Sequence, residues 1–341
     1  MAVPDTRYEN LSPAGLALPP VDRIFITGAS GFIGRTLAGA FRERGADVVG
    51  VDRVADPDAG VVAGEISRPG PWQRAADGSE TVVHTAALVG MPSDVSGFWE
   101  VNVRGTRLAL DAARDAGAKR FVHLSSVVTF GLDFPDGVDE SWPVRTTGVA
   151  YMDTKVAAEQ VVLQAHAAGE IQVTVIRPGD VYGPGSRPWT ILPLEMLRGW
   201  RFALPAGGRG IHSPVYVDDV VEGIIRAAEE ETAAGRVITL SGGIGVETRE
   251  FFGHHARMLG HRRVPTVPTA VALAAASVQS AIARARGTVS ELTPDGVRYL
   301  ALRPGTYGIA TARELLGWQP RIGVTEGMER TEAWAREQGL V

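Results

Sequence analysis

The chain contains no cysteine, no clustered basic run and no long uninterrupted apolar run. Without cysteine, a disulfide scaffold, a thiolate metal site and a cysteine nucleophile are all excluded. This composition suits a reducing compartment, and we expect the cytoplasm. A formal net charge of −5 disfavours a nucleic-acid partner, because phosphate binding needs a footprint of lysine and arginine. The histidines show no HExxH spacing, and the adjacent His254 and His255 would diverge on a helix, so we predict no metal site.

Two stretches bear on export and membranes. Residues 1–20 have no positive segment followed by an apolar one, so we expect a poorly ordered tail rather than a secretory signal. The apolar stretch Val264–Ile282 is interrupted by Pro265 and Pro268 and contains several polar residues. A spanning helix needs about 20 consecutive apolar residues. We therefore expect no membrane span, and a buried or surface-docked amphipathic helix instead.

The order of apolar and amphipathic segments predicts the fold class. Short apolar runs, expected to be strands, alternate with helical patterns through the first half of the 341 residues. Alternation of this kind predicts an α/β fold with a doubly wound parallel Rossmann sheet. We expect this domain over residues 21–182, with residues 211–241 returning to it. Helical patterns dominate after residue 183, which predicts a smaller, mostly helical substrate-binding lobe over 183–341.

A glycine-rich turn follows the first expected strand, with Gly28, Gly31 and Gly34 spaced as GxxGxxG. Glycine lets the backbone approach a pyrophosphate closely, and the helix that begins here presents free N–H groups to the phosphates. A glycine triplet alone is weak, but the order strand, turn, helix favours a dinucleotide site. The same turn would bring Ser30, Phe32 and Ile33 to the cofactor.

An acidic residue ends the second expected strand. The Asp52 carboxylate can accept hydrogen bonds from the ribose hydroxyls of adenosine and would repel a 2′-phosphate, which favours NAD over NADP. Its neighbour Arg53 can instead attract such a phosphate, so NADP stays open. Glu65 and Ile66 can contact adenine, although ordinary loop residues explain them equally well.

A tyrosine and a lysine are placed for proton transfer. Tyr151 and Lys155 share one helix face at i and i+4, and a nearby ammonium is expected to stabilise the phenolate. A tyrosine whose pKa is lowered in this way acts as a general acid or base. Ser125 and Ser126 end an apolar strand, where sheets of this class bind ligands. We choose Ser126 to orient a substrate oxygen; a serine satisfying a backbone group at the strand end is the alternative.

The motifs, taken together, resemble one family. In chain order they are TGASGFIG, Asp52, HTAA (His84–Ala87), NVRGT (Asn102–Thr106), LSSVVTFG, YMDTK, RPGDVYGPG and PVYVDDV. This set looks like the extended short-chain dehydrogenase/reductase superfamily.

The resemblance implies roles for individual residues. Ser126, Tyr151 and Lys155 would form the catalytic triad, and Lys155 would also hold the ribose of the nicotinamide. Asn102 would support the site from its helix, and Pro178 and Val181 would approach the nicotinamide. Further cofactor contacts are expected from Thr85, Ala86, Ala87 and Ser125.

The C-terminal part narrows the resemblance. Leu292-Thr293-Pro294, Tyr307-Gly308 and the run LGWQP at 316–320 look like the 3β-hydroxysteroid dehydrogenase / sterol-4-carboxylate dehydrogenase branch. Sugar-nucleotide epimerases and dehydratases share the LGWxP ending. The Thr-Asp-Glu run of the dehydratases is missing, because Val127-Val128-Thr129 stands in its place, so dehydration is disfavoured.

The residues expected to face substrate are mostly apolar or aromatic: Val89, Met91, Phe130, Phe134, Tyr182, Trp189 and His212. For each aromatic, plain core packing is the alternative, and His212 is equally suited to a structural hydrogen bond. An apolar lining suits a hydrophobic ketone or alcohol. A nucleotide sugar needs cations for its diphosphate, and four arginines can supply them: Arg187, Arg198, Arg201 and Arg209.

These patterns predict an NAD(P)-dependent oxidoreductase that interconverts a secondary alcohol and a ketone on a hydrophobic, steroid-like small molecule. One alternative is a nucleotide-sugar epimerase with tightly held NAD. Another is a catalytically idle chain that binds a dinucleotide as a sensor. Helices expected at 98–116 and 150–168 would form the face of a homodimer.

Overall fold

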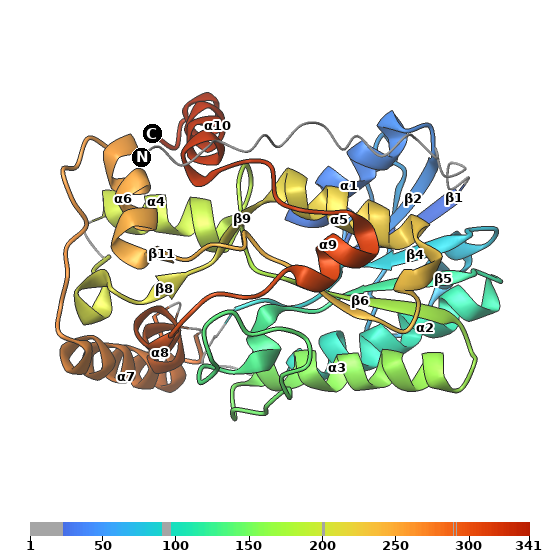
Figure 1. Ribbon diagram of the computed structural model, residues 1–341, viewed down its shortest axis with the longest axis horizontal. Helices are drawn as coiled ribbons and strands as arrows, with labels where there is room; N and C mark the ends of the chain where they lie inside the picture. The colour runs from blue at the N-terminus through green and yellow to red at the C-terminus, as the bar shows by residue number, and fades with distance from the viewer. Residues whose placement is uncertain (1–22, 91–96, 200–201, 289, 291) are drawn as a thin grey trace, which may run out of the picture.

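The computed structural model describes residues 23–90, 97–199, 202–288, 290 and 292–341 (Figure 1). A parallel sheet of seven strands forms its centre, in the order β10-β6-β5-β4-β1-β2-β3. The strands are β1 (Arg23–Thr27), β2 (Asp47–Asp52), β3 (Val61–Ala63), β4 (Thr81–His84), β5 (Arg120–Leu124), β6 (Gln172–Pro178) and β10 (Val237–Leu240). The predicted doubly wound α/β fold is confirmed.

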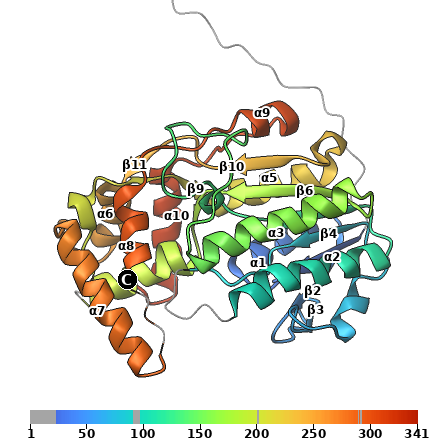
Figure 2. The same cartoon turned by 90° about the horizontal axis from the view of Figure 1, so that it is seen from below.

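Helices cover both faces of this sheet. On one face α1 (Phe32–Glu43) packs against α5 (Val217–Glu229), and on the other α2 (Gly105–Asp115) packs against α3 (Ala150–Ala167) (Figures 1 and 2). The central strands are buried from both sides, as with β4, whose four residues are all buried. This explains why they form continuous apolar runs rather than alternating ones.

The strand order reverses beside β1. Thr27, the last residue of β1, pairs with Val51 of β2 on one side and with His84 of β4 on the other. The chain leaves β1 and β4 toward opposite faces of the sheet, so a crevice opens at the carboxyl ends of these strands. Ligands of doubly wound sheets bind at such a reversal.

The remaining elements form a second, mainly helical part. Its helices are α4 (Leu192–Arg198), α6 (Thr248–Met258), α7 (Thr269–Ala285), α8 (Pro294–Leu302) and α10 (Val324–Glu337), whereas α9 (Ala310–Leu316) packs against β10 and α5 of the sheet domain. Two small ladders accompany them: β7 (Asp180–Tyr182) beside β9 (Pro214–Tyr216), and β8 (Ile211–His212) beside β11 (Val246–Glu247). The helix expected after Pro268 is α7, which packs against α8. No helix in the described ranges is long and apolar enough to cross a bilayer.

The sequence patterns missed the shortest strands. β3, β7, β8, β9 and β11 have two or three residues each. Such segments are too short to show a hydrophobic period, and only their pairing with distant segments makes them strands. β10 is longer than these strands, with four residues. It follows α5 in the chain, pairs with β6 and extends the central sheet.

Candidate active site

A cavity of about 870 Å³ opens along the crevice at the carboxyl ends of the strands and continues into the helical part. Twenty of the residues expected to contact cofactor or substrate line it: Gly28, Gly31, Phe32, Ile33, Gly34, Asp52, Arg53, Glu65, Ile66, Thr85, Ala86, Ala87, Val89, Ser125, Ser126, Tyr151, Lys155, Pro178, Val181 and Trp189. The cavity therefore has a glycine-rich end on the sheet and a second end among the helices.

The turn between β1 and α1 is built around two glycines. Gly28 has a φ of +71°, and a Cβ there would lie 2.8 Å from the backbone nitrogen of Ala86. At Gly34 a Cβ would lie 2.1 Å from the carbonyl oxygen of Gly28. The first hydrogen bond of α1 runs from Arg35 N–H to Gly31 O, at 2.9 Å, which leaves the preceding N–H groups without an acceptor in the helix. This cradle fits a pyrophosphate, since free N–H groups and the positive helix end meet where no side chain intrudes.

Asp52 closes one side of that cradle. Its Oδ2 accepts a hydrogen bond from the backbone N–H of Ser30 at 3.0 Å, and its Oδ1 accepts one from Arg53 N–H at 2.8 Å. Ser30 thus contributes a backbone contact to Asp52 and does not line the cavity. The carboxylate is fixed at the end of β2 with lone pairs left for ribose hydroxyls.

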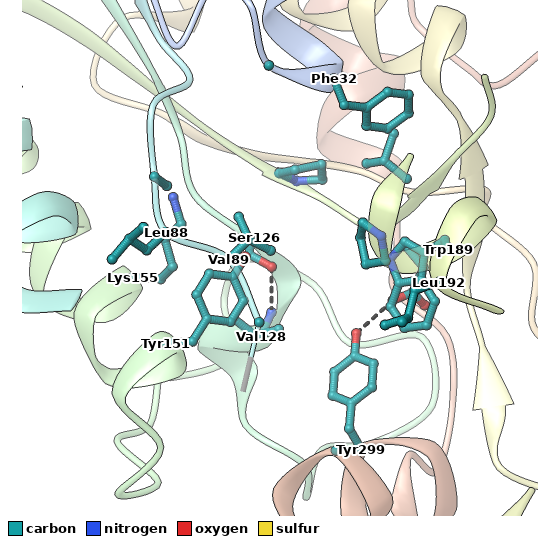
Figure 3. A pocket seen from close by; sticks show the side chains of 18 of the residues that line it. Phe32, Leu88, Val89, Ser126, Val128, Tyr151, Lys155, Trp189, Leu192 and Tyr299 are labelled. Carbon is teal, nitrogen blue, oxygen red and sulfur yellow. Dashed lines mark hydrogen bonds between the residues drawn. The ribbon is translucent and has the colours of Figure 1, made fainter. Parts of the chain in front are cut away.

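Tyr151, Lys155 and Ser126 lie together on one side of the cavity, across from Trp189, Leu192 and Tyr299 (Figure 3). Tyr151 and Lys155 come from the first two turns of α3, and Ser126 follows β5. Ser126 Oγ accepts a hydrogen bond from Val128 N–H at 3.3 Å, and the side chain lies beside Tyr151 (Figure 3). Two segments, the start of α3 and the chain that follows β5, therefore meet at the sheet edge.

The electrostatics of this group differ from the expectation that Lys155 lowers the pKa of Tyr151. Burial raises the pKa of Tyr151 to about 12, with the Asp180 charge adding to the rise and Ser126 opposing it. Burial lowers the pKa of Lys155 to about 8, and the Glu159 carboxylate counteracts part of this. Lys155 Nζ donates to the carbonyl oxygen of Leu124 at 2.8 Å. Desolvation of the phenolate therefore outweighs the ammonium one turn away.

Beneath these residues lies a buried ion pair. Arg177 Nε donates to Glu159 Oε1 at 2.9 Å, and Arg177 Nη2 donates to Glu159 Oε2 at 2.7 Å. Ser125 Oγ donates to the same carboxylate at 2.5 Å. Ser125 is thus held by Glu159, which leaves Ser126 as the serine beside Tyr151.

A second polar group on the cavity wall was not foreseen from the sequence. Asp180 accepts hydrogen bonds from Tyr299 Oη at 2.7 Å, from Arg303 Nη1 at 2.5 Å and from Ser213 N–H at 3.0 Å. Burial opposes ionisation of Asp180, but Arg303 and His212 together with these hydrogen bonds hold its pKa below the usual range. Asp180 and Tyr299 both line the cavity, so its wall carries a buried carboxylate.

The rest of the helical end is apolar. Its lining comes from the segment before α4, from α4 itself and from α6, α7 and α8: Pro188, Trp189, Leu192, Pro193, Met196, Phe202, Phe252, Val267, Val271, Leu292, Val297 and Leu300. Among the described lining residues, the only cations are Arg53 and Lys155, both at the sheet end. Arg187, Arg198 and Arg209 are absent from the lining, and Arg201 lies outside the described residues.

Four residues predicted to contact substrate, Phe130, Tyr182, His212 and Phe134, do not reach the cavity. Phe130 is fully buried beneath the Arg177 guanidinium, 4.7 Å from its ring centroid. Tyr182 follows Val181 on β7; neighbouring side chains of a strand point to opposite faces, and Tyr182 packs against Tyr216 and Phe251 instead.

His212 is the third. It sits behind Trp189, with ring centroids 4.5 Å apart, and burial lowers its pKa to about 4. Phe134 is likewise a core residue, whereas Val89 lines the cavity. Met91 lies outside the described residues.

Asn102 supports the site without lining it. Its Oδ1 accepts from Leu88 N–H at 2.7 Å, and its Nδ2 donates to Leu88 O at 3.0 Å and to Thr154 Oγ1 at 3.1 Å. The side chain therefore ties the loop after β4 to α3, next to Lys155.

Residues 24–240 match the NAD dependent epimerase/dehydratase family. The chain is 32% identical over 324 residues to 4-hydroxy-2-methyl-3-oxo-4-farnesyl-3,4-dihydroquinoline-1-oxide ketoreductase of Stigmatella aurantiaca, covering 90% of this chain and 95% of that protein. It is 31% identical over 249 residues to 3-beta-hydroxysteroid dehydrogenase of Mycolicibacterium neoaurum, covering 67% and 68%.

Among solved structures, MoeE5 in complex with UDP-glucuronic acid and NAD superposes with a TM-score of 0.76 at 27% identity, covering 93% of this chain and 99% of that one. The resemblance inferred from the sequence motifs is thereby confirmed. The chain belongs to the NAD-dependent epimerase/dehydratase family of extended short-chain dehydrogenases/reductases and is an NAD-dependent oxidoreductase.

Proposed function

We propose that this chain interconverts a secondary alcohol and a ketone on an apolar, multi-ring or long-chain substrate. The observation that carries the proposal is the helical end of the cavity, which is walled by apolar side chains and, across its described lining, has no cation. A nucleoside diphosphate there would have to give up its hydration without a positive partner. The buried guanidinium nearest this wall, that of Arg303, is already paired with Asp180 and does not line the cavity.

The names of two relatives support an apolar substrate. The Stigmatella relative is named for a ketoreductase acting on a farnesylated quinoline oxide, and the Mycolicibacterium relative for a steroid dehydrogenase. The second candidate is a nucleotide-sugar epimerase that keeps its NAD, favoured by the similarity in fold to MoeE5 with UDP-glucuronic acid. The two candidates differ in whether cofactor is consumed.

The cofactor would be held by residues of the sheet end. The Gly28–Gly34 turn would bind the pyrophosphate, and Asp52 would bind the ribose of the adenosine. Lys155 would bind the ribose of the nicotinamide. Asp52 favours NAD over NADP because a 2′-phosphate beside its carboxylate would be repelled. When bound, the nicotinamide supplies the acceptor or donor of hydride.

The chain's own residues would handle the proton. In oxidation, the Tyr151 phenolate takes the hydroxyl proton of the substrate while the carbinol carbon gives up hydride, so that the C–O bond becomes a carbonyl. In reduction, the Tyr151 hydroxyl protonates the carbonyl oxygen as hydride adds to the carbon. Ser126 Oγ donates a hydrogen bond to that oxygen. Proton transfer by a positioned group contributes ~10²–10⁴-fold to rate.

An activity screen tests this proposal. Sterols, hydroxylated polyketide-like ketones and 3-oxoacyl esters would be compared with UDP-sugars, each with NAD(H) and NADP(H), by absorbance of the reduced cofactor. We expect stoichiometric cofactor turnover with one of the apolar classes. Interconversion of a UDP-sugar without net cofactor change would contradict it.

We also propose that α2 and α3 form a homodimer face, in a protein of the cytoplasm. The two helices lie side by side over one face of the sheet (Figure 2), and Trp99, just before α2, is 52% exposed. Ala157 and Val161, one turn apart on α3, are only partly buried. Light scattering of the purified protein, with Trp99→Glu as the variant, tests this interface.

A further inference from the structure

The outer helix α7 presents its apolar side to solvent. Val271, Val278 and Ile282 are 55%, 60% and 46% exposed. Spacings of seven and eleven residues place these three side chains on one stripe, and alanines fill the gaps between them. The inward face is small and partly polar, because Ala276 and Ser280 are buried there. A surface helix ordinarily shows the reverse distribution, so this stripe needs an explanation.

The stripe begins at the mouth of the cavity. Val271 and Ala275 line the cavity together with Val267, which precedes the helix. From there α7 runs along the edge of the molecule, at the end opposite β2 and β3 (Figures 1 and 2). On its inner side it packs against α8, which supplies Val297 and Leu300 to the same mouth. One continuous apolar surface thus leads from solvent into the cavity.

Positive charge flanks the stripe at both ends. Arg262 and Arg263 precede α7, Arg284 and Arg286 end it, and all four are exposed. The stretch 257–303 holds seven arginines and two acidic residues, although the whole chain has a net charge of −5. Within the described ranges no carboxylate pairs with any of the four flanking arginines.

We propose that α7 docks on the surface of an anionic lipid bilayer, lying in its plane. The apolar stripe would enter the boundary between headgroups and acyl chains, and the flanking arginines would bind lipid phosphates. A second copy of this chain fits less well, because pairing α7 with α7, in either direction, brings arginines against arginines. If the proposed apolar substrate is correct, the docked cavity mouth faces the membrane in which such a substrate dissolves.

Co-flotation with vesicles tests the docking. Phosphatidylcholine vesicles with and without phosphatidylglycerol would be mixed with the full chain at low and at high salt. We expect binding to the anionic vesicles, weakened by salt. The double variant Val278→Asp/Ile282→Asp and the variant Arg284→Glu/Arg286→Glu should each lower the bound fraction about tenfold. Ile244→Asp is the matched control, since Ile244 is 50% exposed and lies just before β11, which packs against β8 and α6.

Thermal unfolding and NAD binding of each variant establish that it is folded. The docking proposal would be overturned if the wild-type protein does not bind anionic vesicles, or if the Val278/Ile282 variant binds them as well as wild type does. A change of molar mass in these variants without loss of vesicle binding would overturn it too and make α7 a subunit interface. Flotation and ketone turnover are separate readouts, so failure of one leaves the other standing.

Discussion

Glu159 and Arg177 form a bidentate ion pair beneath the active site, with both side chains almost completely buried at 1% and 4% exposure. The pair does not touch the cavity, yet Ser125 donates to it and Lys155 lies one turn before Glu159 on α3. It fixes the ends of β5 and β6 relative to α3. The face that carries Tyr151 and Lys155 is therefore built on a charged layer rather than an apolar one.

Removing one charge of this pair should destabilise the protein. Glu159→Gln keeps the shape of the side chain but leaves the Arg177 guanidinium buried without a counterion, at an expected cost of about 3–5 kcal/mol. Urea unfolding followed by circular dichroism measures the loss. The exposed pair Glu326–Arg330 provides the control, and Glu326→Gln should leave the unfolding midpoint unchanged. Equal midpoints for Glu159→Gln and wild type would contradict the role given to the pair.

Replacing the buried lysine should separate stability from activity. Lys155→Met should abolish turnover but raise the free energy of unfolding at pH 7, because the folded protein no longer holds a desolvated ammonium. With the pKa lowered from 10.5 to about 8, the penalty removed is about 3 kcal/mol.

The sign follows from proton binding. Between pH 8 and 10.5 the unfolded chain binds more protons at this lysine than the folded one, so wild-type stability rises with pH there. The advantage of Lys155→Met is therefore full below pH 8 and disappears as pH approaches 10.5. Lys119→Met, at an exposed lysine, should show neither effect. A difference independent of pH would show that packing, not charge, separates the variant from wild type.

Acid should destabilise the protein through buried neutral histidines. Burial lowers the pKa of His84 to about 3 and those of His212 and His255 to about 4, and it also lowers the pKa of His123. The unfolded chain protonates these groups near pH 6.5, so stability falls as pH drops from about 6.5 toward 4, by up to about 1.4 kcal/mol per pH unit for each histidine.

Urea unfolding at pH 7, 6 and 5 measures this slope. His123→Phe should reduce it, because neither ring nitrogen of His123 has a hydrogen-bond partner within the described structure and its ring already stacks on His84. An unchanged slope in His123→Phe would mean that this histidine is protonated in the folded protein.

The choice between NAD and NADP should depend on one carboxylate. Asp52→Asn keeps the size of the side chain and one acceptor oxygen for the backbone N–H groups of Ser30 and Arg53, but removes the negative charge. We expect the ratio of kcat/KM for NAD over NADP to fall at least tenfold, with Arg53 then free to attract the 2′-phosphate. Steady-state kinetics with both cofactors decides this. An unchanged ratio would place the discrimination elsewhere.

Local patterns were sufficient to predict the sheet end of the site. The glycine turn, Asp52 and the Tyr151/Lys155 pair each combine a residue type with a position in a strand or helix that can be read over a few residues. Phe130 and Tyr182 also belong to recognisable motifs and His212 lies just before one, but the orientation of all three depends on neighbours that a motif does not contain. Tyr182 points into the core because side chains alternate along β7. Phe130 is buried beneath the Arg177 guanidinium.

The helical end could not be predicted in this way. Asp180 meets Tyr299 and Arg303 across separations of 119 and 123 residues. No spacing in the sequence predicts these contacts, because they depend on how α8 packs against α7 and β8. The same is true of α7: its composition suggested an amphipathic helix, but which side faces solvent depends on its packing against α8.

The most direct test of the proposed function is single-turnover hydride transfer by Tyr151→Phe, measured with the apolar substrate found in the screen. The phenyl ring preserves packing against Phe98 and removes only the hydroxyl that would carry the proton. We expect the rate of hydride transfer to fall by ~10²–10⁴-fold while the dissociation constant for NAD stays within about twofold of wild type. Hydride transfer at the wild-type rate in Tyr151→Phe would contradict the assignment of Tyr151 as the general acid and base.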